Sequence, residues 1–85
     1  MNQSHKLKVW PEYYKELLTG RKTFEIRNND RDFKIGDVLV LKEFDPIRNI
    51  FTKREIHKAV TYITDFNQAD GFVVMGLSRE FLSLI

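Results

Sequence analysis

Cysteine is absent from this 85-residue chain, and histidine occurs twice, at His5 and His57. The lack of cysteine excludes disulfides, thiolate metal sites and thiol nucleophiles. Two histidines supply at most part of a metal site, and single histidines are commonly surface or core residues. We therefore expect a protein that carries neither a metal nor a cofactor.

Long apolar runs are also missing. No stretch approaches the ~20 apolar residues that a membrane-spanning helix needs, and the first residues, Met1 to Ser4, lack the apolar segment of a secretory signal. The apolar and aromatic content is ordinary for a folded chain, and the length fits a single domain over residues 1–85. We expect a soluble, cytoplasmic monomer.

The formal net charge is +2, which permits a nucleic-acid partner without requiring one. The positions of the basic residues are more informative than the total. One group lies between Gly20 and Asp37, and consists of Arg21, Lys22, Arg27, Arg31 and Lys34. A second group consists of Lys53, Arg54 and Lys58. Solvated strand faces explain such charges as readily as a binding surface does.

The first part of the chain predicts a strand followed by a helix. Over residues 5–9, Leu7 and Val9 point inward, and Lys6 and Lys8 point outward. Pro11 suits the first position of a helix, and Gly20 suits its C-terminal cap. The helix has an apolar stripe at helical spacing, made of Trp10, Tyr13, Tyr14, Leu17 and Leu18. Such a stripe is typical of core packing, although its aromatic rings also suit base stacking.

The central stretch has the alternation of a strand with one buried face. Over residues 23–28, Phe24 and Ile26 share one face, which we expect in the core. Glu25 and Arg27 share the other face with Thr23, and we expect it to border a cleft. Residues 28–34 follow as a polar loop.

The second half of the chain predicts three more strands. They cover residues 38–44, which we expect to be buried on both sides, residues 52–64, and residues 72–77. Lys58 interrupts the second of these on the face of Ile56 and Val60, and residues 47–51 form a hairpin connection. The apolar tail, residues 81–85, is expected to pack. About five strands and one helix favour an α+β fold with a small mixed β-barrel, which hides its strand edges.

The central stretch resembles the signature of the ASCH superfamily, Gly-x-Lys-x-x-Glu-x-Arg, at Gly20, Lys22, Glu25 and Arg27. More of the chain, from residue 5 to about residue 78, is similar to a subfamily of small bacterial and phage-associated ASCH-like domains of unknown function. The shared segments are His5-x-Leu7-Lys8, residues 11–14, residues 22–33 and residues 36–43. The chain departs from the subfamily at Lys53, where glycine is usual.

The resemblance implies a PUA-like mixed barrel with the helix after the first strand, and a cleft between barrel and helix. It also implies binding of RNA or a nucleotide at that cleft. The residues that we expect to contact nucleic acid are Lys8, Arg21, Lys22, Glu25, Arg27 and Arg31. Arginine and lysine hold phosphates, and arginine also stacks on or hydrogen-bonds a base.

Enzymatic alternatives remain open, although we favour a binding protein. Some ASCH-fold amidohydrolases act on acetylated cytidine nucleosides with a lysine, a threonine three positions later and a distant glutamate. Here Lys22 is kept, but Glu25 stands in the threonine's place. A metal-independent nuclease would use His5 or Glu25 as a base beside a phosphate held by Lys22 or Arg27. A third alternative is a phage or mobile-element protein-interaction module.

Overall fold

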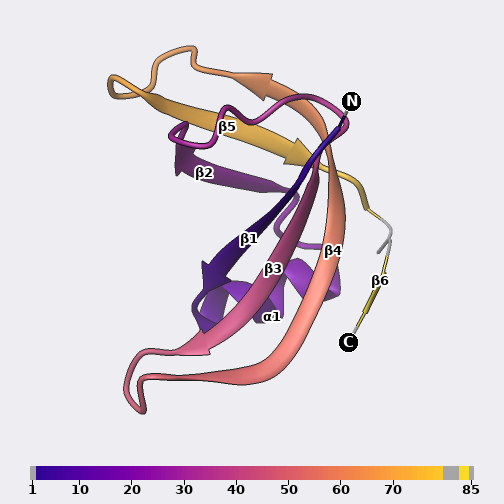
Figure 1. Cartoon of the computed structure of the whole chain (residues 1–85), viewed down its shortest axis with the longest axis vertical. Helices are drawn as coiled ribbons and strands as arrows, with labels where there is room; N and C mark the ends of the chain where they lie inside the picture. The colour runs from indigo at the N-terminus through magenta and orange to yellow at the C-terminus, as the bar shows by residue number, and fades with distance from the viewer. Residues whose placement is uncertain (1, 80–82, 85) are drawn as a thin grey trace.

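The computed structural model describes residues 2–79 and 83–84, and shows one helix with a mixed sheet (Figure 1). The elements in chain order are β1 (Ser4–Val9), α1 (Pro11–Thr19), β2 (Phe24–Asn28), β3 (Val38–Asp45), β4 (Ile50–Thr64), β5 (Phe72–Leu77) and β6 (Ser83–Leu84). The α+β class and the single helix after the first strand agree with the sequence prediction.

The sheet follows the order β1-β3-β4-β5-β2, and β6 adds to β4. β1 pairs with β3 in parallel, and the other pairs are antiparallel. β4 pairs with β3 from Ile50 to Ala59 and then with β5 from Val60 to Thr64. This long, curved strand therefore carries the sheet from one half of the molecule to the other (Figure 1).

The two ends of the strand path, β1 and β2, are bridged by side chains. Among the described strands no backbone ladder joins β1 to β2, so closure into a barrel is not confirmed. Arg27 of β2 donates through Nη2 to the carbonyl oxygen of Lys8 at 2.8 Å, and Arg31 donates through Nη1 to the carbonyl oxygen of Lys6. We call these two contacts the arginine seam.

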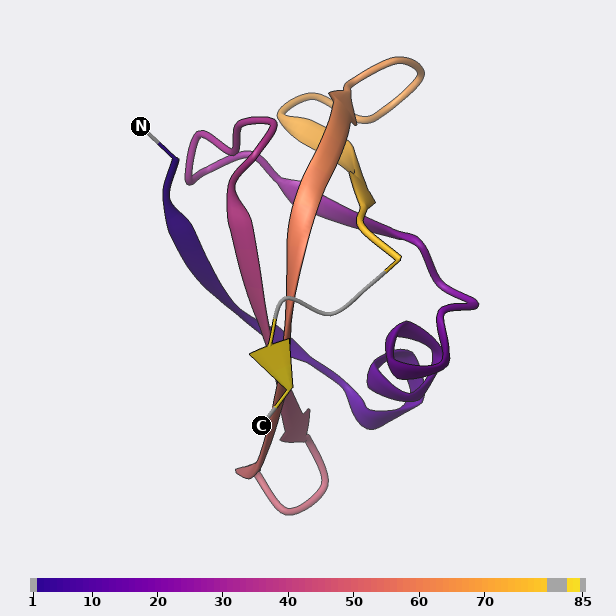
Figure 2. The ribbon, with the colours of Figure 1, turned by 90° about the vertical axis from the view of Figure 1, so that its right-hand side faces the viewer.

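β1 and α1 form as their sequence predicts. Leu7 and Val9 are buried in β1, and Tyr14 and Leu17 of α1 reach the same core. The helix begins at Pro11 and ends at Gly20, whose φ of 84° is the left-handed conformation that glycine adopts readily. Figure 2 shows α1 beside the curled sheet. With nine residues, α1 is too short to cross a membrane, and none of the described residues forms such a helix.

The prediction that Phe24 and Ile26 lie in the core is wrong, although Glu25 and Arg27 do border a groove. Glu25 is 4% exposed, whereas Phe24 and Ile26 are 40% and 49% exposed. The pairing with β5 explains the inversion, because directly opposed residues share a face. Glu25 lies opposite Met75, which is in the core, and Phe24 lies opposite Gly76 on the outer face. The strand therefore turns its polar side chains inward.

The later strands agree with their predicted spans, except that β4 begins at Ile50, within the predicted connection of residues 47–51. Leu39, Val40 and Leu41 are all buried in β3, and β5 covers Phe72–Leu77 as expected. Lys58 is fully buried on the core face of β4, where desolvation lowers its pKa. In the tail, Ser83–Leu84 pairs with β4, while residues 81, 82 and 85 lie outside the described part of the chain.

Candidate functional site

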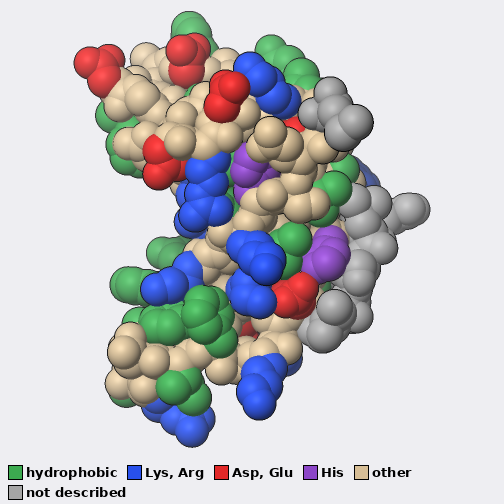
Figure 3. Space-filling view, viewed as in Figure 1, with side chains coloured by type: hydrophobic (Ala, Val, Ile, Leu, Met, Phe, Trp, Pro, Cys, Tyr) green, Lys and Arg blue, Asp and Glu red, His purple; other side chains and the backbone are tan. Residues whose placement is uncertain are grey.

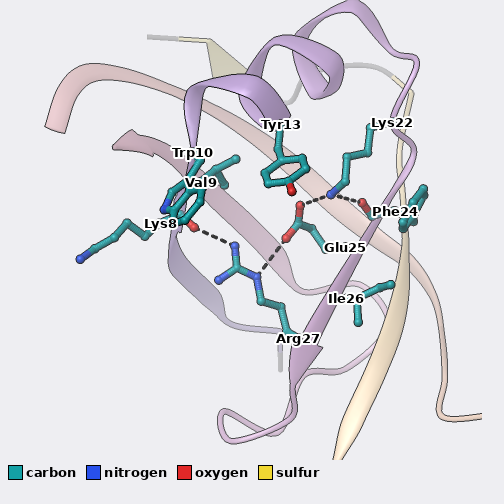
Figure 4. A pocket seen from close by; sticks show the side chains of 9 residues that line it. All are labelled: Lys8, Val9, Trp10, Tyr13, Lys22, Phe24, Glu25, Ile26 and Arg27. Carbon is teal, nitrogen blue, oxygen red and sulfur yellow. Dashed lines mark hydrogen bonds and ion pairs between the residues drawn. The ribbon is translucent and has the colours of Figure 1, made fainter. Parts of the chain in front are cut away.

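A groove of about 590 Å³ opens between the end of β1, the start of α1 and β2 (Figure 4). Its lining combines three cations, a carboxylate, three aromatic residues and two aliphatic ones: Lys8, Lys22, Arg27, Glu25, Trp10, Tyr13, Phe24, Val9 and Ile26. The space-filling view shows the molecule hollowed on one side, with lysine and arginine side chains gathered around the hollow (Figure 3). This groove is the candidate site.

Glu25 organises the cations of the groove. Its Oε1 accepts from Nζ of Lys22 at 2.7 Å, and its Oε2 accepts from Nε of Arg27 at 2.9 Å. A buried carboxylate needs such partners, because an uncompensated charge in the interior is strongly destabilising. Here the two bonds place an ammonium and a guanidinium on either side of one carboxylate (Figure 4). Glu25 therefore acts as a positioning residue.

Lys22 and Arg27 are each held at several points. Nζ of Lys22 also donates to the carbonyl oxygen of Phe24 at 2.9 Å, and lies 5.0 Å from the Phe24 ring centroid and 5.7 Å from that of Tyr13. Arg27 uses Nε for Glu25 and Nη2 for the arginine seam. A guanidinium carries five N–H donors, so Arg27 retains donors for a ligand.

Exposed aromatic rings line the helix side of the groove. Trp10 precedes α1, Tyr13 lies in its first turn, and each side chain is about half exposed. Tyr14 is buried in the core, which is the packing that its helical stripe predicts. Phe24 and Ile26 border the groove from β2, but their side chains point away from Glu25 (Figure 4).

The predicted contact residues separate into two sets. Lys22, Glu25 and Arg27 meet in the groove, and Lys8 also lines it, although its side chain extends away from the other three (Figure 4). Arg21 is largely exposed outside the lining, 3.8 Å from Glu16, and Arg31 is engaged in the arginine seam. Arg21 and Arg31 therefore do not line the groove.

His5 does not reach the groove. It is buried, and its Nε2 lies 2.8 Å from Oδ2 of Asp37. Burial raises the pKa of Asp37, but hydrogen bonds from the Gln3 N–H, His5 and the Lys34 N–H outweigh it and leave that pKa below its ordinary value. The proposed pairing of His5 with a phosphate held by Lys22 therefore lacks its geometry. Within the described residues, no group of three or more His, Asp or Glu side chains is placed to hold a metal.

Sequence reasoning missed a charged pair behind α1. Arg54 binds Glu43 through Nε and Nη2 at 2.8 and 2.9 Å, and its guanidinium carbon lies 5.1 Å from the ring centroid of Tyr14. The hydrogen bond from Arg54 holds the pKa of Glu43 below its ordinary value. Positions 43 and 54 meet only through the register of the β3–β4 hairpin, so no local pattern indicates the pair.

The turn at Lys53 has an unusual backbone. Lys53 has a φ of 74°, in the left-handed region, and the register between β3 and β4 shifts at this point. Glycine adopts this conformation without steric cost, whereas a lysine side chain is strained there.

Fold and groove define a small mixed α+β domain with a charged, partly aromatic cleft. The family model described as "Domain of unknown function (DUF3850)" matches residues 4–77, and the chain belongs to this family. The chain is also similar to a protein of Escherichia phage P2, described as "Uncharacterized 12.9 kDa protein in GpA 3'region". The two are 33% identical over 67 residues, which cover 79% of this chain and 60% of the phage protein. The match thus spans less than two thirds of that relative.

Proposed function

We propose that this domain binds RNA or a free nucleotide in the groove. The observation that supports this proposal is a single groove whose lining includes three basic residues and two exposed aromatic rings. Cations hold phosphate groups, and aromatic rings stack on bases irrespective of base identity. Both parts of a nucleotide thus find a complementary surface.

The charge of the groove favours an anionic ligand. Lys8, Lys22 and Arg27 outnumber the single carboxylate of Glu25, and that carboxylate is buried beneath the cations. Its two hydrogen bonds fix the ammonium of Lys22 and the guanidinium of Arg27 before any ligand arrives. Preorganised donors lose less conformational entropy on binding, which increases affinity.

We also infer membership of the ASCH superfamily and a barrel-like, PUA-type closure of the sheet. Support for the first comes from the signature residues Lys22, Glu25 and Arg27, which lie together in the groove. Support for the second comes from the arginine seam, which links the strands at the two ends of the path. A cytoplasmic location and a monomeric state remain predictions from the sequence.

Titration of fluorescent single-stranded RNA at several salt concentrations tests the proposed function. If three cations neutralise phosphates, the plot of log affinity against log salt should have a slope of about −2, from about −0.7 for each phosphate. Lys22→Ala should reduce the magnitude of that slope by about 0.7. Lys34→Ala is the matched control, because Lys34 is exposed, pairs with Asp32 and lies outside the groove.

The proposal fails if folded protein binds neither RNA nor nucleotides at the lowest salt concentration. It also fails if binding is independent of salt, or if Lys34→Ala weakens binding as much as Lys22→Ala does. The first of these results would favour a protein partner for the groove.

A further inference from the structure

The β3–β4 hairpin presents a second aromatic surface next to the groove. Phe44 and Phe51 face each other across the hairpin, with ring centroids 5.0 Å apart and an interplanar angle of 72°. Phe44 is almost buried, but Phe51 is 44% exposed. The exposed ring is thus backed by a second ring that fixes its position. We call this surface, with the lysines described next, the hairpin station.

Two lysines accompany these rings. Nζ of Lys8 lies 4.2 Å from the Phe44 ring centroid and 5.9 Å from that of Phe51. Nζ of Lys42 lies 5.7 Å from the Phe51 centroid and forms an ion pair with Glu55 at 3.0 Å. Among the described residues, no carboxylate lies within ion-pair distance of Lys8, so its charge is available to an external anion.

Lys8 connects the hairpin station to the groove. It lines the groove through its place at the end of β1, and its ammonium lies over the hairpin rings. Lys8 and Lys42 are also neighbours in the register of β1 with β3. Aromatic and basic side chains are therefore present both in the groove and in the hairpin station, and Lys8 belongs to both.

We propose that the hairpin station is a second base-binding subsite, and that the ligand is a single strand of nucleic acid longer than one nucleotide. One nucleotide occupies the groove, Lys8 contacts the phosphate that follows it, and the next exposed base stacks on Phe51. This inference rests on the proposed function. It favours a nucleic-acid single strand, rather than a free nucleotide, as the ligand. A duplex is disfavoured because its base faces are already stacked and cannot reach an aromatic platform.

A length series of ligands tests the inference. Uridine monophosphate is compared with single-stranded oligouridylates of about two, four and six residues, within the span of known single-strand sites. The longer ligands should bind at least about 5-fold more tightly than the monophosphate, because each stacked base contributes ~1 kcal/mol or more. Phe51→Ala should remove this gain and leave the affinity for the monophosphate unchanged.

Three further variants separate stacking from other effects. Phe51→Trp should keep the gain, whereas Phe51→Leu should lose it while preserving an apolar side chain at the same place. Phe66→Ala is the matched control, since Phe66 is 78% exposed in the β4–β5 connection and belongs to neither surface. Thermal melting of each variant checks that the domain remains folded.

The outcomes distinguish this inference from the proposed function. If the monophosphate and the oligomers bind equally, or if Phe51→Ala does not reduce the gain, the second subsite is wrong while groove binding stands. If a duplex gains as much as the single strand, the single-strand assignment is overturned. If no nucleotide of any length binds the folded protein, the proposed function and this inference fail together.

Discussion

Arg27 donates through Nε to Oε2 of Glu25 at 2.9 Å, across two positions of the same strand. Because successive residues of a strand alternate between faces, this spacing places both side chains on one side of β2. That side faces the groove. The bond thus fixes the guanidinium of Arg27 at the mouth of the groove.

Glu25→Gln separates orientation from charge. The substitution makes the groove more positive, so electrostatics alone predicts tighter binding of RNA. If Glu25 positions Lys22 and Arg27, the variant should instead bind about 5-fold more weakly, the equivalent of ~1 kcal/mol, which is about the net contribution of one hydrogen bond. RNA titration at constant salt measures the change. Tighter binding would show that Glu25 does not act by positioning.

Phe24→Ala should have a small effect on stability because Phe24 is half exposed on the outer face of β2. We expect a loss of about 1 kcal/mol or less in the free energy of unfolding. Leu39→Ala, at a fully buried position, should lose about 2–5 kcal/mol. Urea denaturation of both variants gives the comparison. Equal losses would contradict the observed orientation of β2.

Lys53→Gly should stabilise the domain. A Cβ atom in the left-handed region destabilises the folded state by about 1–2 kcal/mol, and glycine removes this strain. Glycine also raises the conformational entropy of the unfolded chain, which cancels part of the gain. We expect a net gain of about 0.5–1 kcal/mol in the free energy of unfolding. Lys53→Ala is the control, because it removes the charge and keeps the strained Cβ. An equal gain in the alanine variant would assign the effect to charge.

Acid should weaken the fold in part through Glu43. The hydrogen bond from Arg54 lowers the pKa of Glu43 below its ordinary value of 4.5, so the folded state binds this proton less readily than the unfolded chain. The stabilisation is complete above pH 4.5 and is lost as the pH falls through the lowered pKa. Glu43→Gln should therefore show a shallower fall in stability between about pH 5 and pH 3. Urea denaturation across this range tests it, with exposed Glu12→Gln as the control.

Acetylcytidine should not be deacylated by this protein. Glu25 stands where the ASCH-fold amidohydrolases that the sequence resembles have a threonine, and it is buried and bonded to Lys22. Thr23 is exposed next to the strand and is not among the groove residues. Chromatography of the nucleoside after incubation provides the assay, and Glu25→Thr is the informative companion. Turnover by the unmodified protein that is lost in Lys22→Ala would establish the enzymatic alternative.

Local sequence signals predicted most of the architecture but not the orientation of β2. Pro11 and Gly20 mark the ends of α1, and the alternation around Leu7 marks β1, because these signals depend on neighbouring residues alone. The alternation around Glu25 predicts a strand but does not say which face is inside. That choice follows from the opposition of Glu25 to Met75 and of Phe24 to Gly76, which depends on pairing with a distant strand. The pair Arg54–Glu43 was missed for the same reason.

The arginine seam makes the joint between β1 and β2 chemically different from every other junction in the described sheet. Backbone ladders persist through almost any substitution, whereas this joint depends on the identity of Arg27 and Arg31. A guanidinium there also prefers an anionic acceptor to a neutral carbonyl, since charge-assisted hydrogen bonds are stronger. Exchanging Arg27 would thus remove the side-chain bridge from β2 to β1, although the backbone ladders of the described sheet do not use its guanidinium.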